Sequence, residues 1–291
     1  MQGPKAAYLD GTERLHLQHG PIDLIIGAEA DQPAARQAAF ETAISRFETL
    51  LEELVAELPL LRQPLPLAAA PEGFVARRMY QAADLYAAHS FVTPMIAVAG
   101  AVADEILDVM TSAVSLRRAY VNNGGDIALH LTPGAQYAAA MISPDGTDLG
   151  RIAIEAGTGI GGLATSGRAG RSLSLGIADS VTVAAFDAAR ADSAATLIAN
   201  AVDLPEHPGI RREAANQLQP DSDLGARAVV CDVPTLSMDE KAAALARGQA
   251  CAEAMIRDGT IAGAALFLQQ SSEIVGSLSL PNKPVPEMPD V

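Results

Sequence analysis

Apolar residues recur at steps of three and four along a segment near the start of the chain, and this spacing predicts an amphipathic helix over residues 33–58. The apolar stripe of this helix consists of Phe40, Ile44, Phe47, Leu51, Leu54 and Leu58. Before the helix, short apolar or alternating runs at residues 14–18 and 22–26 predict a β-hairpin. After it, the four prolines between residues 59 and 71 predict a linker.

The next apolar segments predict two further helices. One covers residues 73–87, and the other begins at Thr93 and Pro94, where Thr suits the cap and Pro the first turn, and runs to residue 110. This third helix is apolar nearly all round, so we expect it to be buried on every side. Gly100 within it costs about 1 kcal/mol relative to Ala, which indicates that another element packs very close to it.

The rest of the chain alternates strand-like runs with turns and two helices. Residues 119–187 predict several strands separated by Gly, Pro and Asn turns. The later elements are a helix over residues 188–200, a helix that starts at a capping box of Ser237 and Glu240 and runs to Asp258, and strands over residues 261–268 and 274–280. The segment between residues 203 and 220 is expected to be a loop with a short helix.

Composition and charge narrow the functional classes. Of the 291 residues, 49% are hydrophobic and 19% are charged, which is typical of a globular protein. The net charge of -15 argues against general binding of nucleic acid and against docking on anionic lipid. With no secretory signal and no apolar run long enough to span a bilayer, we expect a cytoplasmic protein with no membrane partner. The two cysteines, Cys231 and Cys251, are expected to be reduced thiols.

One glycine-rich segment matches the spacing of a dinucleotide-binding loop. Residues 157–162 read GTGIGG after a strand-like run, but such a site also needs a helix that begins there. The sequence that follows is rich in Gly and Ser, which favours a turn between strands. An NAD(P)-binding oxidoreductase is therefore the less favoured interpretation.

Three other segments could carry chemistry, although each also has a purely structural interpretation. Residues 164–170 offer backbone N–H groups, hydroxyls and Arg168, which suit an anionic ligand. Residues 122–126 carry an Asn-Gly signal that is typical of a hairpin turn. Asp192 and Thr196 share one face of a predicted helix, and a carboxylate beside a hydroxyl can bind a hard cation.

Together these segments resemble the ApbE-like family, which includes the FAD:protein FMN transferases. The closer resemblance is to its short cytoplasmic branch, an uncharacterised protein family. The motifs that carry it occur in the family's order: ERLH (13–16), IDL (22–24), TPMIAVAGAVAD (93–104), NGGDI (123–127), LATSGRAGRSLSLGIADSVTV (163–183) and ARADSAAT (189–196).

The resemblance implies a fold and a set of site residues. The implied fold is one compact α+β domain over residues 1–280, a T-fold-like antiparallel sheet with helices, in a homodimer, followed by a disordered tail over residues 281–291. The implied activity splits FAD and attaches FMN to a Thr or Ser hydroxyl, using Mg²⁺. The implied metal ligands are Asp192, Thr196 and the carbonyl of Val98. The residues implied to bind FAD, FMN or another phosphorylated ligand are Asn123, Gly124, Gly125, Asp126, Ala164, Thr165, Ser166, Gly167 and Arg171.

The sequence also departs from the family pattern. Ala99 stands where the transferases carry Lys, no His–Asp–Pro segment follows residues 164–167, and Arg171, Ile177 and Thr93 stand where the short branch usually has His, Lys and Gly. A general base of the usual kind is thus missing at the expected place, and the sequence leaves the catalytic residues unassigned. Two hypotheses follow: a Mg²⁺-dependent flavin transferase of reduced or altered activity, or a non-catalytic metabolite-binding accessory protein in sulfur or homocysteine metabolism.

Overall fold

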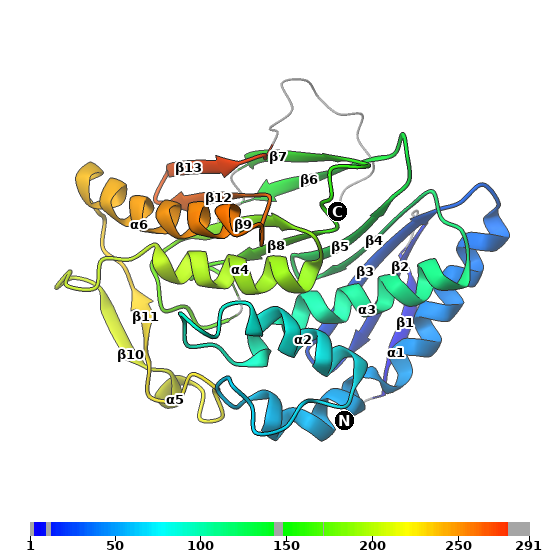
Figure 1. Cartoon of the computed structure of the whole chain (residues 1–291), viewed down its shortest axis with the longest axis horizontal. Helices are drawn as coiled ribbons and strands as arrows, with labels where there is room; N and C mark the ends of the chain where they lie inside the picture. Colours follow the sequence, from blue (N-terminus) through cyan, green and yellow to red (C-terminus); the bar gives the residue numbers. More distant parts are fainter. Residues whose placement is uncertain (1–2, 10–12, 143–147, 171, 279–291) are drawn as a thin grey trace.

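The computed structural model describes residues 3–9, 13–142, 148–170 and 172–278. Nine strands form one sheet in the order β1-β2-β3-β4-β5-β8-β9-β12-β13, and every neighbouring pair is antiparallel (Figure 1). Their bounds are Lys5–Tyr8, Arg14–His19, Ile22–Glu29, Arg118–Asn123, Asp126–Leu131, Gly162–Ser166, Ser180–Ala185, Gly263–Leu268 and Ser271–Gly276. The expected α+β class, with an antiparallel sheet and helices in one compact domain, is therefore confirmed.

The helices lie on one side of this sheet (Figure 1). Their bounds are α1 Pro33–Leu61, α2 Phe74–Asp84, α3 Val98–Ala113, α4 Ala188–Ala201, α5 Ala215–Leu218 and α6 Met238–Arg257, with a 3₁₀ turn, η1, at Pro94–Ala97. Two apolar cores join them to the sheet. One core unites β2 and β3 with α1 and α3, and the other unites β8, β9 and β12 with α4 and α6.

The order of elements along the chain repeats. The first half runs β2, β3, α1, α3, β4, β5, and the second runs β8, β9, α4, α6, β12, β13. In each half, two strands are followed by two long helices and then by two more strands. The four strands of each half occupy four neighbouring positions in the sheet. The two halves meet where β5 pairs with β8, and this junction positions the candidate site described below.

The other side of the sheet is covered by a separate hairpin of β6 (Gln136–Ile142) and β7 (Asp148–Glu155) (Figure 1). Its buried side chains pack against residues of β4, β5, β8, β9 and β12. A third small sheet pairs β10 (Arg211–Ala214) with β11 (Ala228–Asp232). Because β9 is covered on both sides, all six of its residues are buried, including the polar Ser180 and Thr182.

Most of the predicted elements are confirmed, and the errors have physical causes. The hairpin of β2 and β3 and the capping box of Ser237 and Glu240 are present. However, α1 continues through Pro59 to Leu61, because Leu61 is fully buried in the core and holds the last turn in place. Thr93 does not cap the following helix, because its hydroxyl donates to the Asp223 carboxylate instead.

Three strands were missed, namely β1, β10 and β11. All residues of β1 are exposed, so its side chains do not alternate between apolar and polar. β10 and β11 have four and five residues and pair only with each other. Without a buried face, a short strand leaves no periodic signal in the sequence.

The segment at residues 157–162 is a turn that leads into β8, and no helix begins there. The favoured structural interpretation of this segment is confirmed, because Gly157 and Gly159 adopt positive φ angles. A dinucleotide site of the kind considered above would need the N-terminus of a helix at this point.

The apolar helix α3 is buried within one chain along its first part, whereas Asp108, Ser112 and Ala113 near its end are exposed. It packs against α1, α2, α4 and the strands β4 and β5. An ideal Cβ on Gly100 would lie 2.2 Å from the carbonyl oxygen of Ala188, so the close approach predicted for this glycine is confirmed. Because α3 needs no second copy to cover it, the homodimer stays a prediction that rests on the family resemblance.

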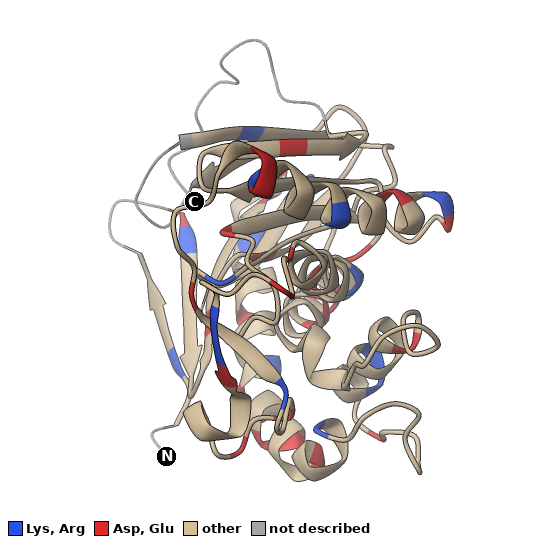
Figure 2. Cartoon of the chain, turned by 90° about the vertical axis from the view of Figure 1, so that its left-hand side faces the viewer, with Lys and Arg blue, Asp and Glu red and all other residues tan. Residues whose placement is uncertain are grey.

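Two observations concern the surface. Within the described ranges, no helix combines the length and apolarity that crossing a membrane requires. In the view of Figure 2, Lys and Arg residues are interspersed with Asp and Glu and do not gather into one patch. The domain boundary expected at residue 280 and the tail after it lie outside the described residues.

Candidate functional site

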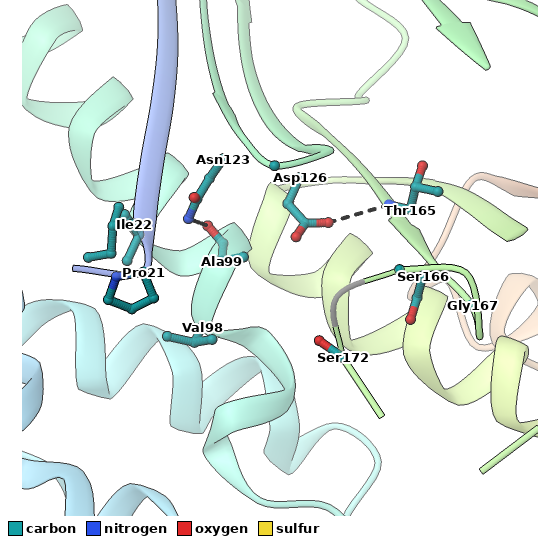
Figure 3. Close-up of a pocket in the computed structure, with 13 residues that line it drawn as sticks. Pro21, Ile22, Val98, Ala99, Asn123, Asp126, Thr165, Ser166, Gly167 and Ser172 are labelled. Carbon is teal, nitrogen blue, oxygen red and sulfur yellow. Dashed lines mark hydrogen bonds between the residues drawn. The ribbon is translucent and has the colours of Figure 1, made fainter. Parts of the chain in front are cut away.

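A cleft opens where the two halves of the sheet meet, and it has two chambers. The first chamber has a volume of about 280 Å³ and lies between the β4–β5 turn, the start of α3 and the end of β8 (Figure 3). It is lined by Pro21, Ile22, Val98, Ala99, Val102, Asn123, Gly124, Asp126, Thr165, Ser166, Gly167, Gly170 and Ser172.

Polar contacts fix the walls of the first chamber (Figure 3). The Asn123 side-chain amide donates to the carbonyl oxygen of Ala99 at 3.1 Å, which ties β4 to the start of α3. The Asp126 carboxylate accepts from the backbone N–H of Thr165 at 3.3 Å, which ties β5 to β8. Between these two side chains, Gly124 and Gly125 form a two-residue turn with positive φ angles, as the Asn-Gly signal predicts.

The second chamber has a volume of about 310 Å³ and adjoins the first. The two chambers share Val98, Ala99, Asp126 and Ser172 in their lining. The other lining residues of the second chamber come from four places: Phe91, Val92, Thr93, Met95 and Ile96; Leu173 and Leu175; Asp192, Thr196 and Asn200 of α4; and Gln219, Ser222, Asp223 and Leu224.

One face of α4 supplies polar groups to the second chamber. Asp192, Thr196 and Asn200 are spaced four residues apart, so they lie one above another on the helix. The Thr196 hydroxyl donates to the Ser166 hydroxyl at 3.3 Å, and Ser166 lines the first chamber. This contact connects α4 with β8 and joins the polar groups of the two chambers.

Asp192 also contacts the start of α3. Its carboxylate accepts from the backbone N–H of Gly100 at 3.1 Å and from that of Ala99. The pKa of Asp192 is raised well above its usual value, first because the surrounding protein removes water from the carboxylate and then because Asp126 repels its charge. The two N–H groups act in the opposite direction. Two carboxylates that repel each other across a cleft favour a cation beside them.

The structure brings most of the residues expected in the site to this cleft. Asn123, Gly124, Asp126, Thr165, Ser166 and Gly167 line the first chamber, Asp192 and Thr196 line the second, and Val98 lines both. Gly125 lies in the turn behind the lining, and Ala164 is fully buried in the core and lines neither chamber. Arg171 lies outside the described residues.

Several lining residues were missed in the sequence. Asn200 could have been found by extending the four-residue spacing of Asp192 and Thr196 by one step. Ser172 follows the predicted loop and lines both chambers. The segment from Gln219 to Leu224 had no recognisable motif, because only tertiary contacts bring it to the cleft.

The wall formed by residues 219–224 is tied to the first half of the chain. Thr93, which is 2% exposed, donates its hydroxyl to the Asp223 carboxylate at 2.5 Å. Nearby, Arg62 forms an ion pair with Asp221 at 2.8 Å, and the Arg227 guanidinium lies over the Phe91 ring.

Replacing Thr93 by Val, which keeps the shape but removes the hydroxyl, should lower the free energy of unfolding by about 1.5–3 kcal/mol. The reason is that the Asp223 carboxylate loses a donor at a partly buried position. Urea denaturation measures the effect, and Thr93→Ser, which keeps the donor, is the matched control. Equal stabilities of the Val and Ser variants would contradict the prediction.

The donor atoms in the cleft fit a hard divalent cation. Among the residues that the structure describes, no group of three or more His, Cys, Asp or Glu side chains could hold a metal ion. Mg²⁺, however, is usually held by one or two carboxylates, with hydroxyl, carbonyl, water or substrate oxygens completing its shell. The side chains of Asp192, Thr196 and Asp126 offer oxygens of this kind around the second chamber.

Comparison with known proteins assigns the chain to a protein family. The chain belongs to the family described as "AbpE bacteria", whose model matches residues 6–277. The expected ApbE-like family is therefore confirmed.

Curated relatives point to the short branch of the family. A UPF0280 protein from Methanothrix thermoacetophila is 35% identical over 170 residues, which cover 56% of this chain and 68% of the relative. A UPF0280 protein from Methanosarcina acetivorans is 34% identical over 199 residues, which cover 66% of this chain and 72% of the relative. The expected resemblance to an uncharacterised branch is confirmed by these relatives.

Solved structures with ApbE names cover most of the chain at low identity. The flavin transferase ApbE from Vibrio cholerae is 15% identical, covers 91% of this chain and 97% of its own, and has a TM-score of 0.41. The ApbE protein from Thermotoga maritima is 11% identical, covers 91% and 96%, and has a TM-score of 0.45. Likeness at this level gives no residue-by-residue correspondence.

Proposed function

We propose that the cleft binds a flavin nucleotide, FAD or FMN, or a related phosphorylated nucleotide, together with Mg²⁺. One observation carries the proposal. The described lining of the two chambers contains the carboxylates of Asp126, Asp192 and Asp223 but no Lys, Arg or His side chain. Such a lining repels phosphate unless a divalent cation lies between them. The resemblance of the motifs to the ApbE-like family, which includes flavin transferases, supports a flavin nucleotide as the ligand.

Asp192 and Thr196, with the carbonyl group of Val98, are the residues that would hold Mg²⁺. When bound, the cation would neutralise the charge of the nucleotide phosphates. The protein's own part is to hold the donors in place. Asp192 is fixed by the N–H groups at the start of α3, and the Thr196 hydroxyl is held by its contact with Ser166. The turn at Gly124 lets a ligand approach the backbone of the first chamber closely.

The same lining argues for slow FMN transfer. Among the described residues of the cleft, no His or Lys could act as a general base. The family resemblance of the helix motif puts Ala99 where the transferases carry Lys. Arg171, outside the described residues, cannot act as a base at physiological pH, and we propose that it serves only as a fixed positive charge. Because a missing general base typically costs about 10²–10⁴-fold in rate, binding without efficient transfer is the expected behaviour. This reasoning favours a metabolite-binding accessory protein as the second candidate function.

Asp192→Asn should weaken FAD binding in the presence of Mg²⁺ by at least about tenfold, and it should remove the dependence of binding on Mg²⁺. The physical reason is that an amide binds a hard cation far more weakly than a carboxylate does. Flavin fluorescence, titrated with and without Mg²⁺, measures both effects. Asp239→Asn, at an exposed position in the first turn of α6, is the matched control and should behave like the wild type.

Catalysis is tested separately by following AMP release from FAD. We expect slow or undetectable release by the wild type. Rapid Mg²⁺-dependent release would contradict reduced activity and establish an efficient transferase or hydrolase. Binding of FAD that is indifferent to both Mg²⁺ and Asp192→Asn would overturn the proposed function.

A further inference from the structure

The helices α3 and α4 meet at the cleft, and each one provides a carboxylate that accepts from backbone N–H groups at the start of the other. Asp192 of α4 accepts from the N–H groups of Ala99 and Gly100 at the start of α3. In return, Asp104 of α3 accepts at 3.0 Å from the N–H of Ala188 and at 2.9 Å from that of Ala189, the first two residues of α4. Each helix therefore satisfies free N–H groups at the start of the other.

The packing around these reciprocal hydrogen bonds leaves little room for α3 and α4 to move apart or to slide. Asp104 is 5% exposed, and both of its oxygens are engaged by α4. The Ala188 carbonyl oxygen would lie 2.2 Å from a Cβ on Gly100, so the two backbones are in direct contact. A shift of α4 at its contact with Asp104 must therefore also move Asp192 relative to the start of α3.

We propose that Asp104 is a positioning residue for the cation site: by holding the start of α4 against α3, it fixes where the Asp192 carboxylate lies. The inference rests on the proposed function, because it concerns the same site. Asp104 lines neither chamber and acts only through α4.

Two observations separate this role from ordinary helix capping. First, α4 already has its own cap, since the Asp187 side chain accepts from the N–H of Arg190 at 2.8 Å. Second, Asp104 is an expensive group to bury. Burial and the neighbouring charge of Asp187 raise its pKa, while the two N–H groups and Arg78 of α2 lower it. A neutral residue would fill the same space without that cost, so the carboxylate is better explained by the link that it makes with both oxygens.

The first experiment tests the link without any metal or nucleotide. Amide hydrogen exchange of Ala99 and Gly100 is compared in the wild type and in Asp104→Asn, at about pH 8, where Asp104 is ionised. In Asn an NH₂ donor replaces one of the two accepting oxygens, so one of the two N–H groups loses its acceptor and the start of α4 should loosen. The two amides held by Asp192 should then exchange at least about tenfold faster.

Asp187→Asn is the matched control, because it makes the same chemical change at a neighbouring carboxylate, while Asn keeps the acceptor for the N–H of Arg190 and the contacts of Asp104 with α4 stay in place. It should leave the amide hydrogen exchange of Ala99 and Gly100 unaffected. Unchanged exchange of Ala99 and Gly100 in Asp104→Asn, or equal acceleration by Asp187→Asn, would overturn the proposal. Asp104→Ser, which keeps a single acceptor, serves the same comparison if the Asn variant does not fold.

The second experiment measures Mg²⁺ affinity by calorimetry on the same proteins. Asp104→Asn should weaken Mg²⁺ binding by at least about tenfold, as is typical when an outer partner of a metal ligand is lost. Asp187→Asn should not weaken it. Equal Mg²⁺ affinities of the wild type and Asp104→Asn would overturn the positioning role. A wild type that binds no Mg²⁺ would instead refute the proposed function, and the amide exchange would still decide whether Asp104 holds Asp192.

Discussion

Gly100→Ala is expected to lower the free energy of unfolding by about 3 kcal/mol or more. The added Cβ would lie 2.2 Å from the oxygen and 2.5 Å from the carbon of the Ala188 carbonyl group. These atoms belong to the backbone of α4, so they cannot rotate away as the end of a side chain can. The gain in helix propensity from Gly to Ala, about 1 kcal/mol, offsets only part of this strain.

Gly248→Ala provides the matched comparison, since Gly248 is also a helical glycine in a crowded place. There the nearest atoms are the side-chain methyl groups of Val202 and Leu266, at 2.3 and 2.7 Å, which can move by changing rotamer. Urea denaturation of both variants should show the larger loss for Gly100→Ala. A smaller loss at Gly100 than at Gly248 would mean that α4 can move away from α3 at low cost.

The stability of the wild type should fall relative to Asp104→Asn as the pH rises from about 4 to about 8, by on the order of 4 kcal/mol. Burial, together with repulsion by Asp187, raises the pKa of Asp104 from its ordinary value of 3.8 to about 7 in the folded protein. A carboxyl with a raised folded-state pKa binds its proton more tightly when folded. Its contribution to stability is therefore fully present below the unfolded pKa and is lost as the pH rises through about 7.

The comparison with Asp104→Asn reports mainly on this group, because the variant is neutral there at every pH and keeps every other titrating side chain. Urea denaturation of both proteins at several pH values gives the difference in unfolding free energy. A difference that stays constant between about pH 4 and pH 8 would show that Asp104 titrates alike in the folded and unfolded chain.

Hydrophobic periodicity predicted the long elements well, because a buried helix face or a strand covered on both sides must be apolar. The stripe of α1 is an example. It failed where burial does not determine structure. β1 is fully exposed, and the end of α1 depends on Leu61 being anchored in the core despite Pro59.

The repeat of two strands, two helices and two strands was not visible in the sequence. Each half needs only apolar side chains at suitable spacing, and many different sequences satisfy that need. The sheet order reveals the repeat, since it places the first half and the second half side by side at β5 and β8.

For the site, the sequence by itself determined the local chemistry. The Asn-Gly-Gly turn, the hydroxyls of Thr165 and Ser166, and the shared helix face of Asp192 and Thr196 all follow from spacing over a few residues. Such features depend on backbone geometry within one turn or one hairpin, and they need no distant partner to be recognised.

Only the tertiary structure decided how these parts act together. It placed Asp126 near Asp192, brought residues 219–224 to the second chamber, and set Asp104 against the start of α4. The residues in these contacts lie far apart in the sequence: Asp126 and Asp192 are 66 positions apart, Thr93 and Asp223 are 130, and Asp104 and Ala188 are 84. The physical reason is that the sequence identifies a carboxylate but not its surroundings. Its hydrogen-bond partners, the charges near it and its loss of water, which together set its pKa, arise only when the chain folds.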